Sequence, residues 1–253
     1  MLSGIGPAGH LRELGIEVHA DVPEVGANLQ DHPLTFIICQ VSRPVAAGSS
    51  NNVEAIAALS SGLSHELPDV QLFVGTMPVN PPPLPTPDNG FGIGVAVTAP
   101  RSRGTVRLNS SAPWVPPLTD LGLLADAHDL DVLDFGLREA RTIAAAPALA
   151  DWKATEVFPA GLILDEASRR AFLRQAVSPY YHPVGTCRLG SDPGSVVDLE
   201  LRVRGIDGLR VADASVMPSI PTANTNATVL AIAERAAALL TGRCPPVASP
   251  SNH

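Results

Sequence analysis

Prolines crowd one stretch of this chain, between residues 78 and 90, and no regular element can cross it. Six of the 25 prolines lie there, namely Pro78, Pro81, Pro82, Pro83, Pro85 and Pro87. Proline fixes its own φ angle and donates no backbone hydrogen bond, so it ends helices and is excluded from central strands. The stretch therefore predicts a long loop, and the fold has to be assembled from the segments on either side.

Short apolar runs on both sides of this loop predict β-strands. Runs of about four to eight residues that are rich in Val, Ile and Phe and bounded by turn residues are typical of strands. They lie at 34–41, 69–74, 91–98 and 104–108, with shorter ones at 16–22 and 209–212. Because the connections between them are long and irregular, we expect a mostly antiparallel sheet.

Helical periodicity marks most of the remaining segments. Leu130, Leu133 and Leu137 recur on one face of the segment 126–146, and Pro147 stops that helix. Shorter helices are expected just after Pro7, at 53–63, at 165–176 and from Asn226 to about Leu240. The sequence thus predicts an α+β fold, a mostly antiparallel sheet with flanking helices.

Charge and cysteine content exclude several kinds of partner. The formal net charge is −8 and no basic tract is present, which argues against nucleic acid as the main partner. The three cysteines (Cys39, Cys187 and Cys244) are far apart and predict neither a metal site nor a disulfide framework. No apolar run reaches the ~18 residues of a membrane span, and no signal stretch opens the chain. We therefore expect a cytoplasmic protein that binds no metal and no membrane.

Three early glycines imitate a dinucleotide-binding loop. Gly4, Gly6 and Gly9 satisfy the pattern G-x-G-x-x-G. That motif needs a strand before it, and only three residues precede Gly4. We interpret the segment as an ordinary glycine-rich turn into a helix. No other part of the chain offers a loop for a cofactor pyrophosphate.

The best acid–base candidate is His182, in the segment Tyr-Tyr-His-Pro-Val-Gly-Thr-Cys-Arg at 180–188. Pro183 restricts His182 to extended backbone, and Gly185 allows another chain or a ligand to approach closely. Imidazole, whose pKa lies near neutrality, is the commonest general acid or base. A histidine that merely hydrogen-bonds in a turn would give the same local sequence, and this alternative stays open.

A second candidate segment lies at 221–229, Pro-Thr-Ala-Asn-Thr-Asn-Ala-Thr-Val, where cap-forming residues precede an apolar helix. A helix start exposes unpaired N–H groups and the positive end of the helix dipole, which can hold an anion. An ordinary N-cap would look the same. Between the two candidates, the segment 208–215 indicates a short strand that runs into a turn with a carboxylate, Asp213.

Five segments, taken in order, resemble the glucose–methanol–choline (GMC) oxidoreductases, FAD enzymes that oxidise alcohols. They are Ser-Gly-Ile-Gly-Pro at 3–7, Val-Gly-Ala-Asn-Leu-Gln-Asp-His at 25–32, Arg-Ser-Arg-Gly-Thr-Val at 101–106, His-Pro-Val-Gly-Thr at 182–186 and Asn-Thr-Asn-Ala at 224–227. Each is modest evidence alone. Their shared order carries the resemblance.

The resemblance implies a set of site residues. His182 matches the family's catalytic histidine and Asn226 its partner, while Asp213, Ala214, Asn226 and Ala227 match positions that contact FAD. The implied reaction removes the hydroxyl proton of a small alcohol and passes a hydride to flavin N5. For His32, in the second of these segments, we expect only a structural role.

The chain departs from the family pattern because it has no amino-terminal βαβ unit with a true dinucleotide loop. We expect a remnant of the FAD-binding domain at 1–33, a substrate-binding domain at 34–185, a closing FAD-domain segment at 186–243 and a disordered tail at 244–253. FAD binding by the chain alone should be weak, and the partner would be a missing amino-terminal half. A truncated or split oxidoreductase, a non-catalytic remnant or binding protein, and a lyase that uses FAD structurally all remain open.

Overall fold

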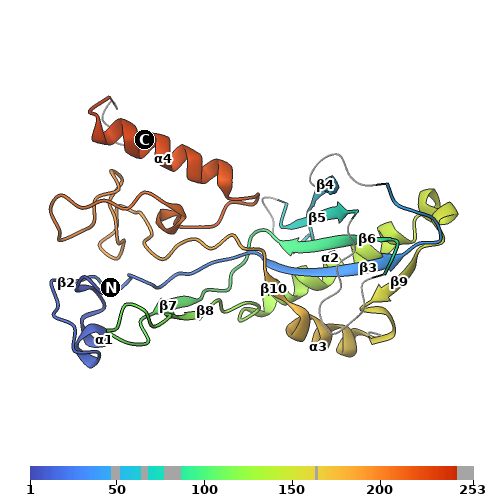
Figure 1. Ribbon diagram of the computed structural model, residues 1–253, viewed down its shortest axis with the longest axis horizontal. Coiled ribbons are helices and arrows are strands. Elements are labelled where there is room, and N and C mark those ends of the chain that lie inside the picture. The colour runs from blue at the N-terminus through green and yellow to red at the C-terminus, as the bar shows by residue number, and fades with distance from the viewer. Residues whose placement is uncertain (47–51, 64–67, 77–86, 163–164, 244–253) are drawn as a thin grey trace.

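Two lobes lie end to end in an elongated molecule (Figure 1). The computed structural model describes residues 1–46, 52–63, 68–76, 87–162 and 165–243. One lobe holds an antiparallel sheet and two helices, and the other holds long loops, two further helices and two small strand pairs. Most of the proline-rich loop predicted at 78–90 and the tail predicted at 244–253 lie outside the described residues.

The sheet has six strands, all paired antiparallel, which confirms the predicted fold class. Its order is β10 (Ser178–Pro179), β3 (Pro33–Gln40), β6 (Gly90–Val97), β5 (Val70–Gly75) and β4 (Val53–Leu59), with β9 (Thr155–Phe158) also paired to β3. The helix predicted at 53–63 is wrong, because that segment is β4. Its Ala- and Glu-containing sequence favours a helix locally, but hydrogen bonding to β5 through residues such as Ile56 and Ala58 overrides that preference.

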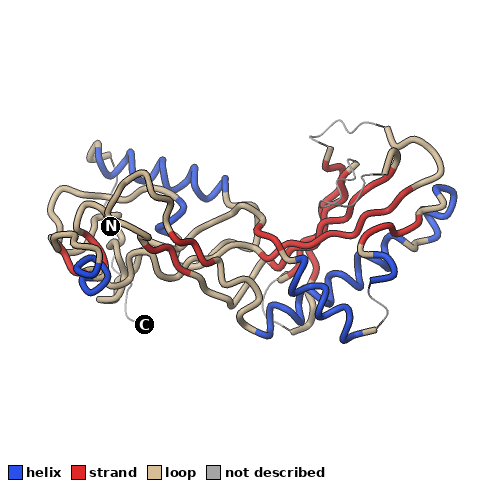
Figure 2. Tube along the Cα trace, turned by 60° about the horizontal axis from the view of Figure 1, so that its bottom comes forward, coloured by secondary structure: helices blue, strands red, loops and turns tan. Residues whose placement is uncertain are grey.

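Both helices of this lobe, α2 (Ala127–Ala144) and α3 (Glu166–Ala176), lie on the same face of the sheet (Figure 2). Ile37 of β3 and Ile93 and Val95 of β6 point toward α2, whose Leu130, Leu133 and Leu137 are fully buried. Each such side chain contributes about 1.5–3 kcal/mol by leaving water. The lobe's core therefore lies between the sheet and α2.

The helix α2 approaches the sheet closely because of a glycine. A Cβ atom built on Gly136 would lie 2.5 Å from a Val95 methyl group. The helix begins after Asp126, whose carboxylate accepts a hydrogen bond from the His128 backbone N–H at 2.9 Å. It ends before Pro147, as its sequence predicts.

Short elements joined by long loops form the second lobe. They are β1 (Ile5–Gly6), α1 (Ala8–Glu13), β2 (Ala20–Asp21), β7 (Thr105–Arg107), β8 (Leu118–Asp120) and α4 (Asn226–Leu240). The described residues also include three 3₁₀ turns: η1 (Pro147–Trp152) and η2 (Ala160–Leu162) in the sheet lobe, and η3 (Ala214–Val216) here. Small aliphatic side chains such as Val197, Leu201 and Val216 form the core of this lobe.

Two predicted strands of this lobe need correction. The strand predicted at 209–212 is wrong, since one isolated bridge between Arg202 and Arg210 is all the pairing it has. Left-handed turns at Gly205 and Gly208 reverse the chain too soon for a longer ladder. The strand predicted at 16–22 shrinks to β2, which pairs parallel with β1.

The first of the glycines that imitate a dinucleotide loop forms a tight turn, and the last, Gly9, lies in α1. Gly4 has a φ of +76°, and a Cβ there would lie 2.4 Å from the Glu17 carbonyl oxygen. The Gly4 carbonyl accepts the N–H groups of both His19 and Ala20 at 2.8 and 3.1 Å. The residue is therefore required for close packing of the chain on itself. No helix in the described part of the chain is long and apolar enough to cross a membrane.

Candidate active site

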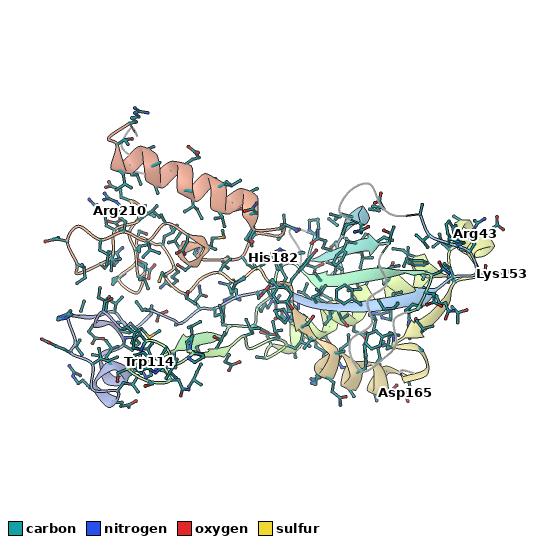
Figure 3. The ribbon with its side chains drawn as sticks, viewed as in Figure 1. Arg43, Trp114, Lys153, Asp165, His182 and Arg210 are labelled. Carbon is teal, nitrogen blue, oxygen red and sulfur yellow. The ribbon has the colours of Figure 1, made fainter. Side chains whose placement is uncertain are left out.

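A buried carboxylate joins two distant segments where the lobes meet. Asp31 is 4% exposed, and its Oδ1 accepts the backbone N–H of His32 at 2.7 Å and that of His182 at 3.0 Å. Backbone hydrogen bonds between Gln30 and Val184, in both directions, continue this pairing. Burial raises the pKa of Asp31, while these two N–H groups oppose the rise. Figure 3 shows that His182 lies at the junction.

The two histidines whose backbone N–H groups bind Asp31 are hydrogen-bonded to each other through their rings. His32 Nδ1 lies 3.0 Å from His182 Nδ1, and the other ring nitrogen of His32, Nε2, lies 3.0 Å from the Pro221 carbonyl oxygen. The rings meet edge to face, with centroids 5.2 Å apart. A chain of hydrogen bonds thus runs from the backbone just before α4, through His32, to His182.

The chemistry of the acceptor fixes which nitrogens carry protons. A carbonyl oxygen only accepts, so His32 Nε2 must donate its hydrogen to Pro221. Burial, with His182 adding repulsion, lowers the pKa of His32 to about 4, so its ring is neutral near pH 7 and Nδ1 is bare. His182 Nδ1 must then donate to it. A neutral His182 therefore keeps its lone pair on Nε2, which has no hydrogen-bond partner among the described residues.

Burial also shifts the titration of His182. It lowers the pKa of this half-buried ring below its ordinary value, and the nearby Asp31 opposes that change. The imidazole is therefore neutral at pH 7, with its single hydrogen on Nδ1. A bare, accessible nitrogen on a neutral ring is what a general base requires.

Tyr180 connects His182 with the sheet. Its ring lies 4.4 Å from the His182 ring, centroid to centroid, and stacks on Phe73 of β5 at 5.4 Å with an interplanar angle of 18°. Its hydroxyl is hydrogen-bonded to the side chain of Asn224, and burial raises its pKa. Gln71 donates to the side-chain oxygen of Asn224 at 3.4 Å. The contacts of Asn224 with Tyr180 and of Pro221 with His32 hold the segment 221–224 beside the histidine pair.

The helix α4 begins two residues after Asn224, with Asn226 and Ala227 exposed in its first turn. Thr225 precedes it and makes no side-chain capping hydrogen bond, so the first N–H groups keep their capacity to donate to another group. No hydrogen bond joins the side chains of His182 and Asn226 within the described residues. Their segments are neighbours through Pro221 and Asn224 instead.

Asp213 and Ala214 lie on a different turn. The Asp213 carboxylate accepts the Ser215 N–H at 2.8 Å and caps η3, while Asp213 itself is exposed. Cys187, five residues after His182, donates its N–H to the Ser215 carbonyl at 2.8 Å. The chain that leaves His182 therefore runs directly alongside η3. Beyond this backbone pairing, no described contact joins Asp213 to the histidine pair.

Three residues of this site are not identified by sequence reasoning. His32 is expected there only to support its loop, and Tyr180 and Asn224 are quoted only as neighbours of His182 and Asn226. Their position in the sequence could have indicated them. Tyr180 and Asn224 each lie two residues from a candidate, and His32 belongs to one of the five family-like segments. Nothing local indicates that His32 and His182, 150 residues apart, touch.

Known proteins share both the sequence pattern and the fold. A sequence profile described as GMC oxidoreductase matches residues 100–233. The choline oxidase of Arthrobacter globiformis is 43% identical over 250 residues, covering 95% of this chain and 45% of that protein. An alcohol dehydrogenase [acceptor] of Pseudomonas putida is 34% identical, covering 95% of this chain and 48% of its own length.

Solved structures agree with this picture. The crystal structure of pyridoxine 4-oxidase from Mesorbium loti superposes with a TM-score of 0.89 at 31% identity, over 96% of this chain and 49% of that one. An FAD-dependent oxidoreductase from Chaetomium thermophilum gives a TM-score of 0.74 at 25% identity, over 96% and 52% of the two chains.

The shared fold and sequence pattern together define the class of protein, the GMC-type oxidoreductases. The chain belongs to the GMC oxidoreductase family. It spans about half the length of the curated relatives that it matches.

Proposed function

We propose that this chain supplies the alcohol-side half of an FAD-dependent oxidoreductase acting on the CH–OH group of a small alcohol, with His182 as the base. The observation that supports this most directly is the hydrogen bond from His182 Nδ1 to His32 Nδ1 at 3.0 Å. It leaves Nε2 of His182 with a free lone pair. The relatives' names, which include oxidases and dehydrogenases of alcohols, agree with this reaction class.

The roles follow from what alcohol oxidation requires. Hydride leaves carbon far more readily from an alkoxide than from an alcohol, so the hydroxyl proton has to be removed. His182 Nε2 accepts that proton, and the amide of Asn226 donates a hydrogen bond to the substrate oxygen. A positioned base of this kind contributes about 10²–10⁴-fold in rate. Two oriented groups also reduce the entropic part of the barrier.

The residues around η3 and the start of α4 suit a flavin. Asp213, Ala214, Asn226 and Ala227 would hold FAD, since all four belong to turns at which backbone N–H groups or polar side chains are presented outward. FAD, when bound, supplies the hydride acceptor at N5. The uncapped N–H groups of the first turn of α4 favour negative charge beside them. These features support binding of the flavin ring. None of the four residues is proposed to hold the phosphates of FAD, so we assign the dinucleotide loop to another half.

The division of the chain follows the same proposal. Residues 1–33 and 186–243 belong to the flavin-binding part, and 34–185 form the substrate-binding part. A further polypeptide segment carrying a βαβ unit completes the enzyme. The alternatives are a non-catalytic remnant or binding protein that cannot hold FAD alone, and a lyase that uses FAD structurally.

Complementation tests this assignment. The 253-residue chain is mixed with a separately expressed flavin-binding half from a GMC relative, and flavin absorbance and alcohol-dependent reduction of an acceptor dye are measured. We expect both, and we expect His182→Ala to keep the flavin but lose turnover by about 10²–10⁴-fold. Flavin binding without turnover of any alcohol would favour the lyase, and failure to bind flavin would favour the remnant.

The protonation state of His182 can be measured without flavin. Two-bond ¹H–¹⁵N correlation spectra of the histidine rings distinguish the two neutral tautomers. We expect His182 to carry its proton on Nδ1 at pH 7.5 and His32 to carry its proton on Nε2. In His32→Asn, His182 should lose this preference. A proton on His182 Nε2 in the unaltered chain would contradict the proposed base.

A further inference from the structure

The face of the sheet that points away from α2 is continuous with the histidine pair. In antiparallel pairs, residues directly opposite each other share a face. The register places Phe36, Gly94, Phe73 and Ile56 in one row across β3, β6, β5 and β4. Because Ile37 and Ile93 point to the α2 side, this row faces the other way. We call it the Phe73 row.

Rings carry the Phe73 row up to the candidate base. Phe36 meets Phe73 edge to face at 5.8 Å, Phe73 stacks on Tyr180 at 5.4 Å, and Tyr180 lies 4.4 Å from His182, all between ring centroids. Gly94 lets the Phe73 ring lie close to the sheet, since a Cβ there would come within 2.2 Å of that ring. An apolar wall therefore begins beside His182 and continues outward across β4.

The outer end of the Phe73 row is uncovered. Ile56 is 61% exposed, which is unusual for a large aliphatic side chain beside a candidate active site. It lies one strand beyond Phe73, about 5 Å away in the hydrogen-bonding direction. Phe73 and Tyr180 lie between Ile56 and His182, so the apolar surface runs from the base to β4 through these two rings.

Charge decides what kind of molecule fits this wall. The neighbouring rows on the same face are Leu34, Ala96, Gln71 and Ala58 on one side, and Ile38, Gly92 and Gly75 on the other. None of these paired residues is charged. The bulge residue Glu54 lies beyond them, at the start of β4, away from the histidines. The buried Asp31 already accepts two backbone N–H groups, and the buried Asp69 is bonded to the N–H and hydroxyl of Ser61.

The aromatic faces offer a cation little compensation. One face of Phe73 is covered by Tyr180, and the ring lies close to the backbone at Gly94. Among the described residues of this wall, a quaternary ammonium group would find neither a carboxylate nor an open ring face to replace the water that it loses. An uncharged carbon skeleton loses nothing comparable and gains apolar contact.

We infer that the substrate is an alcohol whose carbon skeleton is uncharged and apolar and packs along the Phe73 row in the direction of Ile56. This deepens the proposed function and rests on it for the placement of the hydroxyl at His182. It sets this chain apart from an enzyme for choline, which is cationic, although a choline oxidase is among its relatives.

Binding to the 253-residue chain tests the inference without flavin or turnover. Saturation-transfer NMR is recorded with benzyl alcohol and with choline at equal concentration. We expect transfer to benzyl alcohol and little to choline. Ile56→Glu should weaken benzyl alcohol binding about tenfold, equivalent to about 1.4 kcal/mol, and should raise the choline signal.

A matched variant controls for a second apolar site. A separate cavity of about 420 Å³, lined by residues including Val45, Ala148 and Trp152, lies at the other end of the sheet lobe. Ala148→Glu puts the same charge there and should leave benzyl alcohol binding unchanged. Equal or stronger transfer to choline, no transfer to benzyl alcohol, or loss of binding in Ala148→Glu rather than Ile56→Glu would each overturn the inference. Failed complementation with binding intact would count against the proposed reaction alone.

Discussion

The helices α2 and α4 show how differently the two lobes are held together. Eight of the eighteen residues of α2 are buried, whereas of the fifteen in α4 only Ala236 is. Yet α4 is the more apolar sequence, and its Leu230 and Leu240 are 61% and 68% exposed. Packing therefore secures α2, while α4 depends on the helix propensity of its Ala, Leu and Glu residues. The less apolar helix therefore lies against a core, while the more apolar one leaves most of its surface exposed.

The loops of the second lobe also differ from the sheet lobe. The segment 186–212 contains no strand, and its turns are fixed by side chains that bond to backbone or to one another. Arg204 donates to Ser195 Oγ and to the Gly190 carbonyl, both at 2.8 Å. Arg188 and Asp192 form a two-point ion pair at 2.9 Å. The candidate site lies between a lobe in which a sheet packs on α2 and a lobe in which a small aliphatic core is supplemented by side-chain hydrogen bonds to the loops. His32 and Tyr180 lie at the boundary between the two.

Truncating one leucine in each helix gives the largest expected difference between the lobes. Leu133→Ala opens a cavity in the sheet–α2 core and should lower the free energy of unfolding by about 2–5 kcal/mol. Leu230→Ala removes an exposed side chain and should change it by no more than about 0.5 kcal/mol. Urea unfolding followed by circular dichroism measures both. A comparable loss in the two variants would mean that α4 is covered in solution and that the contrast is wrong.

Acid should lower the free energy of unfolding through His32, which lies at the boundary between the lobes. Its pKa is lowered from 6.5 to about 4, so between these values the unfolded chain binds the proton and the folded chain does not. The stability that depends on a neutral His32 is therefore fully present above about pH 6.5 and is lost as the pH falls toward 4. At about 1.4 kcal/mol per pKa unit the loss is on the order of 3 kcal/mol. Urea unfolding at pH 7.5 and pH 4.5 measures it.

The variant His32→Asn separates this effect from general acid destabilisation. It should reduce the difference between the two pH values, whereas His19→Asn, at an exposed position, should leave it as it is. The lowered pKa of His182 contributes in the same direction, so part of the dependence persists. An unchanged pH dependence in His32→Asn would show that the ring is not buried in its neutral form.

Sequence patterns predict this molecule well where structure is local. The period of the leucines and the proline after it locate α2, and the cap-forming residues before Asn226 locate α4. They fail where pairing with a distant segment decides, as in β4, whose composition favours a helix. The strands β9 and β10 are missed because they are too short to show a period.

The candidate site shows the same difference between what local sequence predicts and what distant contacts decide. His182 and Asn226 are predicted because each lies in a segment whose residue types suit a chemical role and because five segments occur in a family's order. The partner His32 is not assigned to the base because the contact depends on the buried Asp31, which reaches both backbones at once. Such a three-way contact has no local pattern. The roles of His182, Asn226, Asp213, Ala214 and Ala227 remain predictions.

A second buried carboxylate fixes the loop that leads out of the sheet lobe. Asp129 is fully buried, and its two oxygens accept the N–H groups of Arg101 and Ser102 at 2.8 Å each. In Asp129→Asn one oxygen becomes an NH₂ group that faces an N–H donor. We expect a loss of about 1.5–3 kcal/mol in unfolding free energy. Asp131→Asn, which removes a partly exposed ion pair with Arg170, should cost no more than about 1 kcal/mol. Equal effects would mean that the loop is not anchored by Asp129.

The smallest expected effect lies at the end of the sheet lobe farthest from His182, where Figure 3 labels Arg43. The Arg43 guanidinium lies 4.3 Å from the centre of the Trp152 ring, and the neighbouring Ser42 donates its N–H and hydroxyl to the Trp152 carbonyl at 3.0 and 3.1 Å. Arg43→Ala should lower stability by about 0.5–1 kcal/mol, as exposed cation–π pairs do. Arg43→Lys should recover part of it, and Arg43→Gln, similar in length but uncharged, should not. If all three variants match the unaltered chain, the backbone hydrogen bonds of Ser42 hold this end, and it resembles the loop lobe more than the core beside it.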